Sequence, residues 1–402
     1  MAEDESRFAP LRLKRKEERR LKTGHLWVFS NEVDVVKTPL KGFEPGQPVR
    51  IEASNGKSLG TGYVNPHSLI AARLVSRDHR HPFSPSLLVH RIKVALSLRE
   101  RLYPGPFYRL LYGEGDGLPG LVIDRYGDVL IGQITTSGME RMKGHIEAAL
   151  TKVVKPAALL WRNDAPVRAL EGLDAYVDSA LGPMPEDLEV CEHDARFRVS
   201  ATSGQKTGWF FDQYDNRARL RRLVPEARVL DLFSYVGAWG IQAARYGAQE
   251  VLCVDSSAAA LEQARANAVL NGVEDRVQME RADAFEVLES LRADSRRFDV
   301  VVVDPPAFIK RRKDAKSGLQ GYYRLNQLAM QVLAKDGMLV SCSCSQILLP
   351  EQLSELIQKG ARHTDRMVQI IDRGHQAADH PVHPAIPETD YLKSVTARFT
   401  MA

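Results

Sequence analysis

The second half of the chain alternates between continuous apolar runs and amphipathic segments. The apolar runs of strand length are VLDLF, EVLCVD, VQMERAD, FDVVVVDPP and GMLVSCSCS, and each is followed by a segment with helical apolar spacing. Continuous apolar strands between helices are typical of a parallel sheet that is covered on both faces. Two last runs, MVQIIDRG and YLKSVTARF, predict an antiparallel pair at one edge. The pattern therefore predicts an α/β fold with a seven-stranded mixed sheet.

The first half has a different pattern, made of short β-rich runs and isolated helices. Residues 11–80 predict a short opening helix followed by small strands, separated by turns such as Asn55-Gly56. The segment HPFSPS is typical of a linker, and residues 87–188 then predict a mixed α+β unit. We therefore expect three domains, at residues 10–80, 87–188 and 189–402.

The composition is that of a folded, soluble protein. The chain has 402 residues, of which 44% are apolar and 26% are charged. No apolar run approaches the roughly 20 residues of a membrane span, and the N-terminal segment lacks the apolar core of a secretory signal. Four cysteines are too few for a disulfide framework. We expect a cytoplasmic protein with no membrane partner.

The charge distribution says more than the net charge of +4. Residues 12–22 are strongly basic, and a second basic cluster occupies residues 310–313. Either run is explained equally well by a solvated face or by contacts with phosphates. Charge alone leaves the choice between these two explanations open.

Four successive predicted strands end in a carboxylate. The acids are Asp231, Asp255, Asp283 and Asp304. A single acid in this position is an ordinary N-cap of the next helix. Open α/β sheets bind ligands at the carboxyl ends of their strands, and four acids in register are harder to explain as caps. We expect a ligand site at this edge of the sheet.

The glycine pattern selects S-adenosylmethionine (SAM) over a dinucleotide. The first turn, DLFSYVG, has the single Gly237 in place of the G-x-G-x-x-G that receives a pyrophosphate, and no Walker motif occurs. SAM carries no phosphate. Asp255 is suited to the ribose hydroxyls and Asp283 to the adenine amino group, while the backbone of residues 233–237 can approach the methionine moiety.

Two features suggest covalent chemistry on a pyrimidine. Asp304-Pro305-Pro306 ends one strand, and a serine-rich segment with Cys342 and Cys344 ends the next. C5 of a pyrimidine attacks a methyl group only after a nucleophile such as a thiolate adds to C6. Asp304 could then stabilise the adduct at N3. The base that removes the C5 proton is not identified by the sequence.

Two other interpretations of the cysteines compete. Cys342 and Cys344 could be small buried apolar residues, as free cysteines often are. They could also form a metal site with His380 and His383, but this spacing is not a strong zinc pattern, and we expect no metal.

The chain resembles a known family, the ribosomal RNA large subunit methyltransferase I group of 23S rRNA cytosine-C5 methyltransferases. The matching stretches are HLWVFSNEV, GDGLPGLVIDRYGD, QKTGWFFDQYDNR, VLDLFSYVGAWG, DPPAF, the SCS of residues 343–345, QAADHP and YLK. The resemblance implies an N-terminal RNA-binding PUA domain, a middle α+β domain and a Rossmann-like class I SAM domain. It also implies 23S rRNA as the partner and leaves a homodimer open.

The resemblance assigns residues to roles. It selects Cys344, not Cys342, as the nucleophile, with Asp304 beside it. The SAM pocket would comprise Asp231, Phe233, Ser234, Tyr235, Val236, Gly237, Asp255, Asp283 and Asp304. Lys206, Thr207, Gly208 and Asp212 would close over the methionine end. Many RNA cytosine-C5 methyltransferases carry a second cysteine after the first proline of this motif, but here Pro306-Ala307 follows, which puts product release by a second thiol in doubt.

Three other functions would each explain part of the sequence. A guanine-N2 methyltransferase has a similar DPP-x-F motif and sheet but needs no thiol at the position of Cys344. An RNA-binding protein with a vestigial SAM fold would have no reason to keep four strand-end acids. A small-molecule methyltransferase would not need the N-terminal β domain and its basic opening segment.

Overall fold

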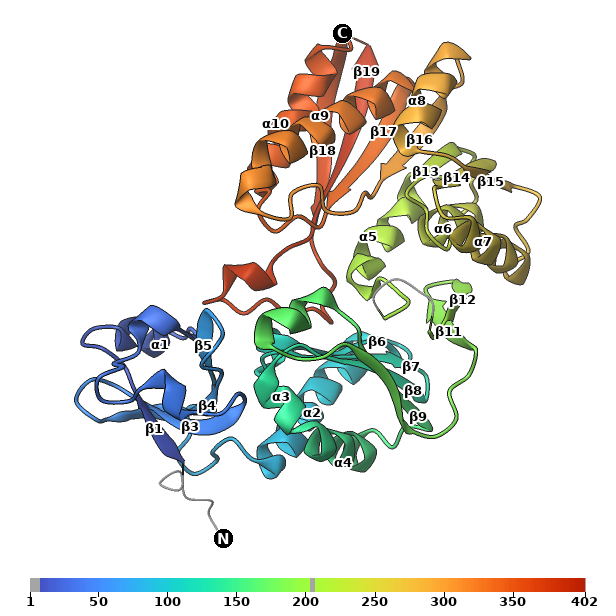
Figure 1. Cartoon of the computed structure of the whole chain (residues 1–402). Helices are drawn as coiled ribbons and strands as arrows, with labels where there is room; N and C mark the ends of the chain where they lie inside the picture. The colour runs from blue at the N-terminus through green and yellow to red at the C-terminus, as the bar shows by residue number, and fades with distance from the viewer. Residues whose placement is uncertain (1–7, 203–206, 402) are drawn as a thin grey trace. The chain divides into compact units, whose positions relative to one another are not determined.

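The computed structural model describes residues 8–202 and 207–401 and divides the chain into two compact units (Figure 1). The first unit comprises residues 1–188, 200–209 and 378–389, and the second comprises residues 189–199, 210–377 and 390–402. Two segments that the sequence assigned to the third domain, 200–209 and 378–389, thus lie in the first unit. Along the described ranges, no helix combines the length and the apolar character that crossing a membrane requires.

The first unit begins with a five-stranded sheet of order β1-β3-β4-β5-β2. The elements are β1 (Ala9–Arg12), α1 (Glu18–Lys22), β2 (Trp27–Phe29), β3 (Gln47–Glu52), β4 (Ser58–Val64) and β5 (Ile70–Ser76). The opening segment is partly a strand, so the helix predicted from residue 11 was wrong in its extent. Leu11 and Leu13 alternate with polar residues, and both are fully buried in the core of this sheet. That alternation is a strand period, which the basic residues around it obscure.

A second sheet of the first unit has the order β10-β9-β8-β7-β6. Its strands are β6 (Phe107–Tyr112), β7 (Leu121–Tyr126), β8 (Val129–Ile134), β9 (Ala158–Asn163) and β10 (Tyr176–Leu181), with α2 (Pro85–Leu102), α3 (Ser137–Arg141) and α4 (Lys143–Val153). Helix α2 begins at Pro85, inside the segment predicted as a linker, because Ser84 caps it and Pro85 occupies its first turn. Strand β10 was not predicted, since half of its residues are exposed, none is buried, and they lack an apolar pattern.

The second unit opens with a hairpin and a short helix. The hairpin consists of β11 (Asp187–Glu192) and β12 (Ala195–Ser200). The polar segment after it forms the short helix α5 (Tyr214–Ala218), and a 3-10 turn over Arg219–Arg222 continues it. The buried pair of Arg217 and Glu192, with 2.5 Å between Nε and Oε1, ties this helix to the hairpin.

The large sheet confirms the predicted seven-stranded mixed α/β fold, with the order β15-β14-β13-β16-β17-β19-β18. Its strands are β13 (Arg228–Leu232), β14 (Glu250–Asp255), β15 (Val277–Arg281), β16 (Phe298–Val303), β17 (Leu333–Ser343), β18 (Arg366–Gly374) and β19 (Lys393–Met401). The first five are parallel, and β18 and β19 form the antiparallel pair. The connecting helices are α6 (Ala238–Arg245), α7 (Ala258–Leu270), α8 (Ala284–Ala293), α9 (Ala315–Gln331) and α10 (Pro350–Arg362).

The strand order positions the site. Strand β13 lies between β14 and β16, so the direction in which strands are added reverses at β13. Ligands bind in the crevice that such a reversal opens at the carboxyl ends of the strands. Beneath it, the core joins the sheet to α8, α9 and α10 through residues such as Leu230, Val301 and Leu339. A ligand is therefore expected at the carboxyl ends of the central strands β13 and β16.

Candidate active site

Three loops leave the sheet at this edge. The register aligns Leu232 with Val303, and Val303 with Ser341. The segments that follow these three residues, 233–237, 304–309 and 342–345, therefore begin at nearly the same height. The sequence prediction that the strand ends converge depends on this register.

The loop after β13 has an unusual backbone. Phe233 and Tyr235 have φ values of 62° and 49°, in the left-handed region that costs non-glycine residues about 1–3 kcal/mol each. Gly237 has a φ of 82°, and a Cβ there would lie 2.8 Å from Ile241 Cδ1. The bend lets Tyr235 N–H donate to Asp255 Oδ2 at 2.9 Å. The loop is thus fixed to the end of β14.

Asp231 is fully buried at the start of this loop. Gly240 N–H donates to its Oδ2 at 2.9 Å. Burial raises the pKa of Asp231 to about 8; the bond from Gly240 opposes the rise, and the charges of Asp304 and Asp255 add to it. Within the described residues, Asp231 Oδ1 and Ser234 Oγ are buried without a hydrogen-bond partner. Buried polar atoms in that state fit a site that a polar ligand completes, such as the amino-acid end of SAM.

Asp255 and Asp283 differ in how they are used. The two oxygens of Asp255 accept backbone N–H groups of Tyr235 and Ser257, both at 2.9 Å, and the residue stays partly exposed. Each oxygen keeps a lone pair that could accept a ribose hydroxyl. Asp283 Oδ1 accepts the N–H groups of Phe285 and Glu286, at 2.8 and 3.3 Å, and so caps α8. The N-cap explanation thus holds for Asp283, whose Oδ2 is the oxygen left for an adenine amino group.

Asp304 is held by two donors on a single oxygen. Gln213 Nε2 and Trp239 Nε1 donate to its Oδ2 at 2.9 and 3.0 Å. Burial raises the pKa of Asp304 to about 6, and the hydrogen bonds from Trp239 and Gln213 oppose that rise. Sequence reasoning missed both donors, although each lies in a stretch that carried the family resemblance, QKTGWFFDQYDNR and VLDLFSYVGAWG.

The two cysteines at the end of β17 have different environments. Cys342 is fully buried, its thiol lies 3.5 Å from Ser394 Oγ, and burial raises its pKa well above the ordinary value. Cys344 is partly exposed and lies just beyond the strand. Cys342 therefore has the surroundings of an inert structural thiol, whereas Cys344 has the access that a nucleophile needs.

A buried tyrosine connects the segment of Cys344 to the segment of Asp304. The hydroxyl of Tyr322, on α9, lies 2.9 Å from Ser343 Oγ and 2.8 Å from Ser345 Oγ. Ile309 N–H donates to Ser345 Oγ at 3.2 Å. The two serines that flank Cys344 are thus fixed to the loop that follows Asp304. No local pattern in the sequence indicated this role of Tyr322.

The segment 205–213 is divided between the two units. Lys206 lies outside the described residues. Thr207 and Gly208 belong to the first unit, where the Thr207 hydroxyl donates to Asp124. Asp212 belongs to the second unit, where its Oδ2 accepts the Tyr391 hydroxyl and its carbonyl accepts Ala377 N–H at 2.9 Å. The roles expected for these residues at the methionine end of SAM stay predictions.

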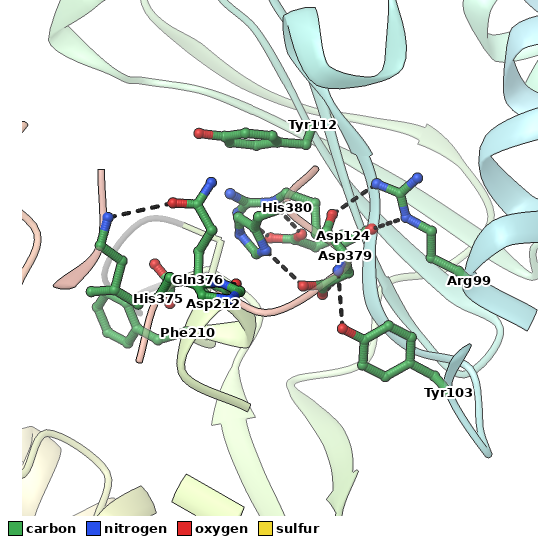
Figure 2. Close-up of polar contacts among 12 residues, drawn as sticks. Arg99, Tyr103, Tyr112, Asp124, Phe210, Asp212, His375, Gln376, Asp379 and His380 are labelled. Atoms are coloured by element: carbon green, nitrogen blue, oxygen red, sulfur yellow. Dashed lines mark hydrogen bonds and ion pairs between the residues drawn. The ribbon is translucent and has the colours of Figure 1, made fainter. Parts of the chain in front are cut away.

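The histidines considered for a metal site have other partners. His380 and His383 belong to the first unit, and His380 Nδ1 lies 2.7 Å from Asp379 Oδ1 (Figure 2). The carbonyl oxygen of Asp379 accepts a hydrogen bond from Arg99 at 2.7 Å, and its backbone N–H donates to the Tyr103 hydroxyl, as Figure 2 shows. In the part of the chain that the structure describes, no three His, Cys, Asp or Glu side chains gather as a metal site.

Comparison with known proteins gives two domain matches. A model of the PUA-like domain matches residues 11–77, and a model of the S-adenosylmethionine-dependent methyltransferase family matches residues 173–394. A solved structure described as a methyltransferase in complex with SAH superposes with a TM-score of 0.83 at 22% identity, over 97% of this chain and 100% of that chain. The SAM-dependent methyltransferase fold and its cofactor are thereby established.

Curated relatives match nearly the full length. The ribosomal RNA large subunit methyltransferase I of Shewanella denitrificans is 36% identical over 96% of this chain and 98% of the relative. The protein of the same name from Erwinia tasmaniensis is 36% identical over 95% of this chain and 97% of the relative. The chain therefore belongs to the ribosomal RNA large subunit methyltransferase I family of SAM-dependent methyltransferases.

Proposed function

We propose that this chain transfers a methyl group from SAM to C5 of a cytosine in 23S rRNA through a covalent bond between Cys344 and C6. Ribosomal RNA is the substrate class in the names of its relatives. The observation that carries the proposal is the partly exposed Cys344 at the same sheet edge as Asp304, between two serines fixed to the Asp304 loop.

The reaction needs a thiolate and a proton at opposite ends of the ring. The Cys344 thiolate adds to C6, and protonation of N3 lets the electron pair collect at C5. SAM, once bound, supplies the methyl group that C5 attacks. A base then removes the C5 proton, the thiolate leaves as the double bond between C5 and C6 forms again, and N3 gives up the proton that it received. Because Cys344 returns as a thiolate, one thiol is sufficient for the cycle.

Asp304 is suited to the N3 position. A carboxyl group with a pKa of about 6 holds a proton in a useful fraction of molecules near neutral pH, and it can transfer that proton to N3. Both donors to Asp304 end on Oδ2, so within the described residues Oδ1 keeps its capacity for the substrate. We infer that Oδ1 faces N3 and the exocyclic amine of cytosine.

The cofactor residues follow from the same arrangement. Asp231 and Ser234 would receive the methionine end, Asp255 the ribose hydroxyls, and Asp283 the adenine through Oδ2. Residues 233–237 would contact the cofactor through their backbone, and Asp304 would border it. Lys206, Thr207, Gly208 and Asp212 would close over it. The PUA-like domain within residues 10–80 would bind the RNA outside the target base.

The identity of the product nucleoside tests the proposal. The full-length protein is mixed with a 23S rRNA transcript and SAM labelled in its methyl group, and the RNA is digested to nucleosides. We expect the label in 5-methylcytidine, with no transfer by Cys344→Ser and nearly full transfer by the matched control Cys342→Ser. Label in N2-methylguanosine would indicate the guanine-N2 activity, and transfer to C5 by Cys344→Ser would overturn the role of Cys344.

A further inference from the structure

A buried lysine lies next to the segment that carries Cys344. Lys393 is the first residue of β19, it is 7% exposed, and the antiparallel register pairs it with Ser343. Its Nζ donates to the carbonyl oxygens of Ser345 and Tyr391, both at 2.9 Å. The ammonium group is thus bonded to Ser345, which follows Cys344. Its own strand, β19, pairs with Ser343, which precedes Cys344.

The cost of burying this lysine asks for an explanation. A buried ammonium group is stable only when it is well paired, and two carbonyl oxygens replace only part of its hydration. Burial lowers the pKa of Lys393, whereas the negative charges of Asp390 and of the Cys344 thiolate oppose that change. If the lysine served only to bond the two carbonyl groups, an exposed lysine or a neutral donor would do so with a smaller loss of hydration free energy.

The groups around Cys344 make the lysine distinctive. The titratable groups near this thiol include Tyr322 from α9, Cys342 from β17 and Lys393 from β19, and Asp304 from the end of β16 lies near Cys342. Tyr322 and Cys342 are neutral at physiological pH, and burial raises the pKa of each. Asp304 can only add negative charge. Of these groups, Lys393 alone can stabilise a thiolate by its charge.

We propose that Lys393 is the positioning residue that keeps Cys344 in its thiolate form, through an ammonium group fixed beside the thiol by the Ser345 and Tyr391 carbonyls. This inference rests on the proposed role of Cys344 as nucleophile. A thiolate is the reactive form of cysteine, and a neighbouring lysine is one of the arrangements that lower a thiol pKa. No proton transfer to or from Lys393 is required, because the lysine acts by its charge.

The test is the pH dependence of Cys344 alkylation in the full-length protein. The rate of reaction with iodoacetamide is followed at the Cys344 peptide by mass spectrometry, without RNA or SAM. We expect the wild-type thiol to titrate below the ordinary value of about 8.5. Lys393→Met should shift the midpoint upward by about 1–2 pH units, Lys393→Arg should restore most of the shift, and the exposed control Lys335→Met should change nothing.

Each result decides the question. An ordinary midpoint in the wild-type protein would overturn the proposal even if a variant fails to fold. Equal midpoints in Lys393→Met and wild type, or Lys393→Arg behaving like Lys393→Met, would also overturn it and leave Lys393 with a structural role. The measurement is independent of the product: a normal thiol midpoint with an inactive Cys344→Ser ends this inference alone, whereas an active Cys344→Ser ends the proposed function.

Discussion

Trp239 Nε1 donates a 3.0 Å hydrogen bond to Asp304 Oδ2, and this bond spans the point where the strand order reverses. Trp239 lies at the start of the helix after β13, and Asp304 follows β16. Gln213 donates to the same oxygen. The orientation of the acid is therefore set in part from the helix that follows the proposed cofactor loop, which couples the proposed N3 contact to the proposed SAM site.

Removing the indole donor should raise the pKa of Asp304. A hydrogen bond to a carboxylate favours its charged form, so Trp239→Phe should move the pKa above the present value of about 6. We expect the limb of the kcat/KM profile that reports Asp304 to move to higher pH. The same change at Trp161, which donates to Glu147 elsewhere, is the control. A limb that stays in position, or moves to lower pH, would contradict this account of Asp304.

Asp231 should make the protein less stable as the pH rises. Its pKa is about 8 in the folded chain against 3.8 for an ordinary aspartate. Between these values the folded state binds more protons than the unfolded state, so the free energy of unfolding falls as pH increases. Asp231→Asn removes this titration. We expect its thermal midpoint to fall less than that of wild type between pH 5 and pH 8 in buffered melts.

Asp231→Asn should also bind SAM less tightly than the wild-type protein. If Asp231 Oδ1 receives the cofactor's ammonium group, an amide in its place should weaken binding by roughly tenfold or more at pH 8, measured by calorimetry. Unchanged SAM affinity together with a flattened stability profile would mean that Asp231 is a buried structural acid and not a cofactor ligand.

Tyr322→Phe should reduce turnover while leaving SAM affinity unchanged. The hydroxyl bonds Ser343 and Ser345 on both sides of Cys344, so its loss leaves each buried serine hydroxyl with one hydrogen bond fewer, at about 0.5–1.5 kcal/mol of unfolding free energy per bond. We expect kcat to fall at least tenfold, because a displaced thiol attacks poorly. Tyr323→Phe, which loses a contact with His363, is the matched control. Equal turnover in the two variants would remove Tyr322 from the catalytic arrangement.

The basic cluster at residues 310–313 should contribute to RNA binding. Arg311 is paired with Asp314, whereas no ion pair with a carboxylate is recorded for Lys310, Arg312 and Lys313 among the described residues. Changing these three residues to alanine should weaken RNA affinity without changing SAM affinity. The slope of the logarithm of the RNA association constant against the logarithm of salt concentration should become less steep by roughly 0.7–0.9 for each phosphate contact that is lost. An unchanged salt slope would make the cluster a solvated surface.

The basic opening segment, residues 12–22, has less positive charge free for RNA phosphates than its composition indicates. Arg12 pairs with Glu52, Arg20 with Glu32, and Lys22 with Glu18. The first two ion pairs tie the segment to the rest of its domain and the third lies within α1, so part of its positive charge is neutralised within the fold. The sequence could not separate the two uses of charge, since two of the partners lie far along the chain.

What could be predicted from the sequence is the part that local pattern controls. The seven strands follow from apolar runs, and the convergence of Asp231, Asp255 and Asp304 follows from the rule that parallel strands end at one edge. Asp283 shares that edge but also serves as an N-cap, a choice that the pattern left open. Strand β10 and the short helix α5 could not be delimited from the sequence, because their residues carry no clear apolar period.

The residues that the sequence did not identify act through non-local contacts. Gln213, Trp239, Tyr322 and Lys393 each reach a site residue from a different element. Their side chains are ordinary helix, turn or strand residues in the local pattern, and the pairing of elements across the sheet gives them their partners. The register of β17 and β19 places Lys393 beside the segment of Cys344, and the helices and turns that carry the other three residues bring them to the ends of β16 and β17.

The central claim is the bond between Cys344 and C6 of a cytosine, and it is tested most directly by trapping that bond. In a 23S rRNA transcript made with 5-fluorocytidine, the fluorine at C5 cannot be removed as a proton, so the adduct persists after methyl transfer. We predict a complex that survives denaturing electrophoresis, with the RNA on the Cys344 peptide, and no complex with Cys344→Ser. A modified nucleotide on another residue, or methyl transfer to unsubstituted cytosine by Cys344→Ser, would contradict the account.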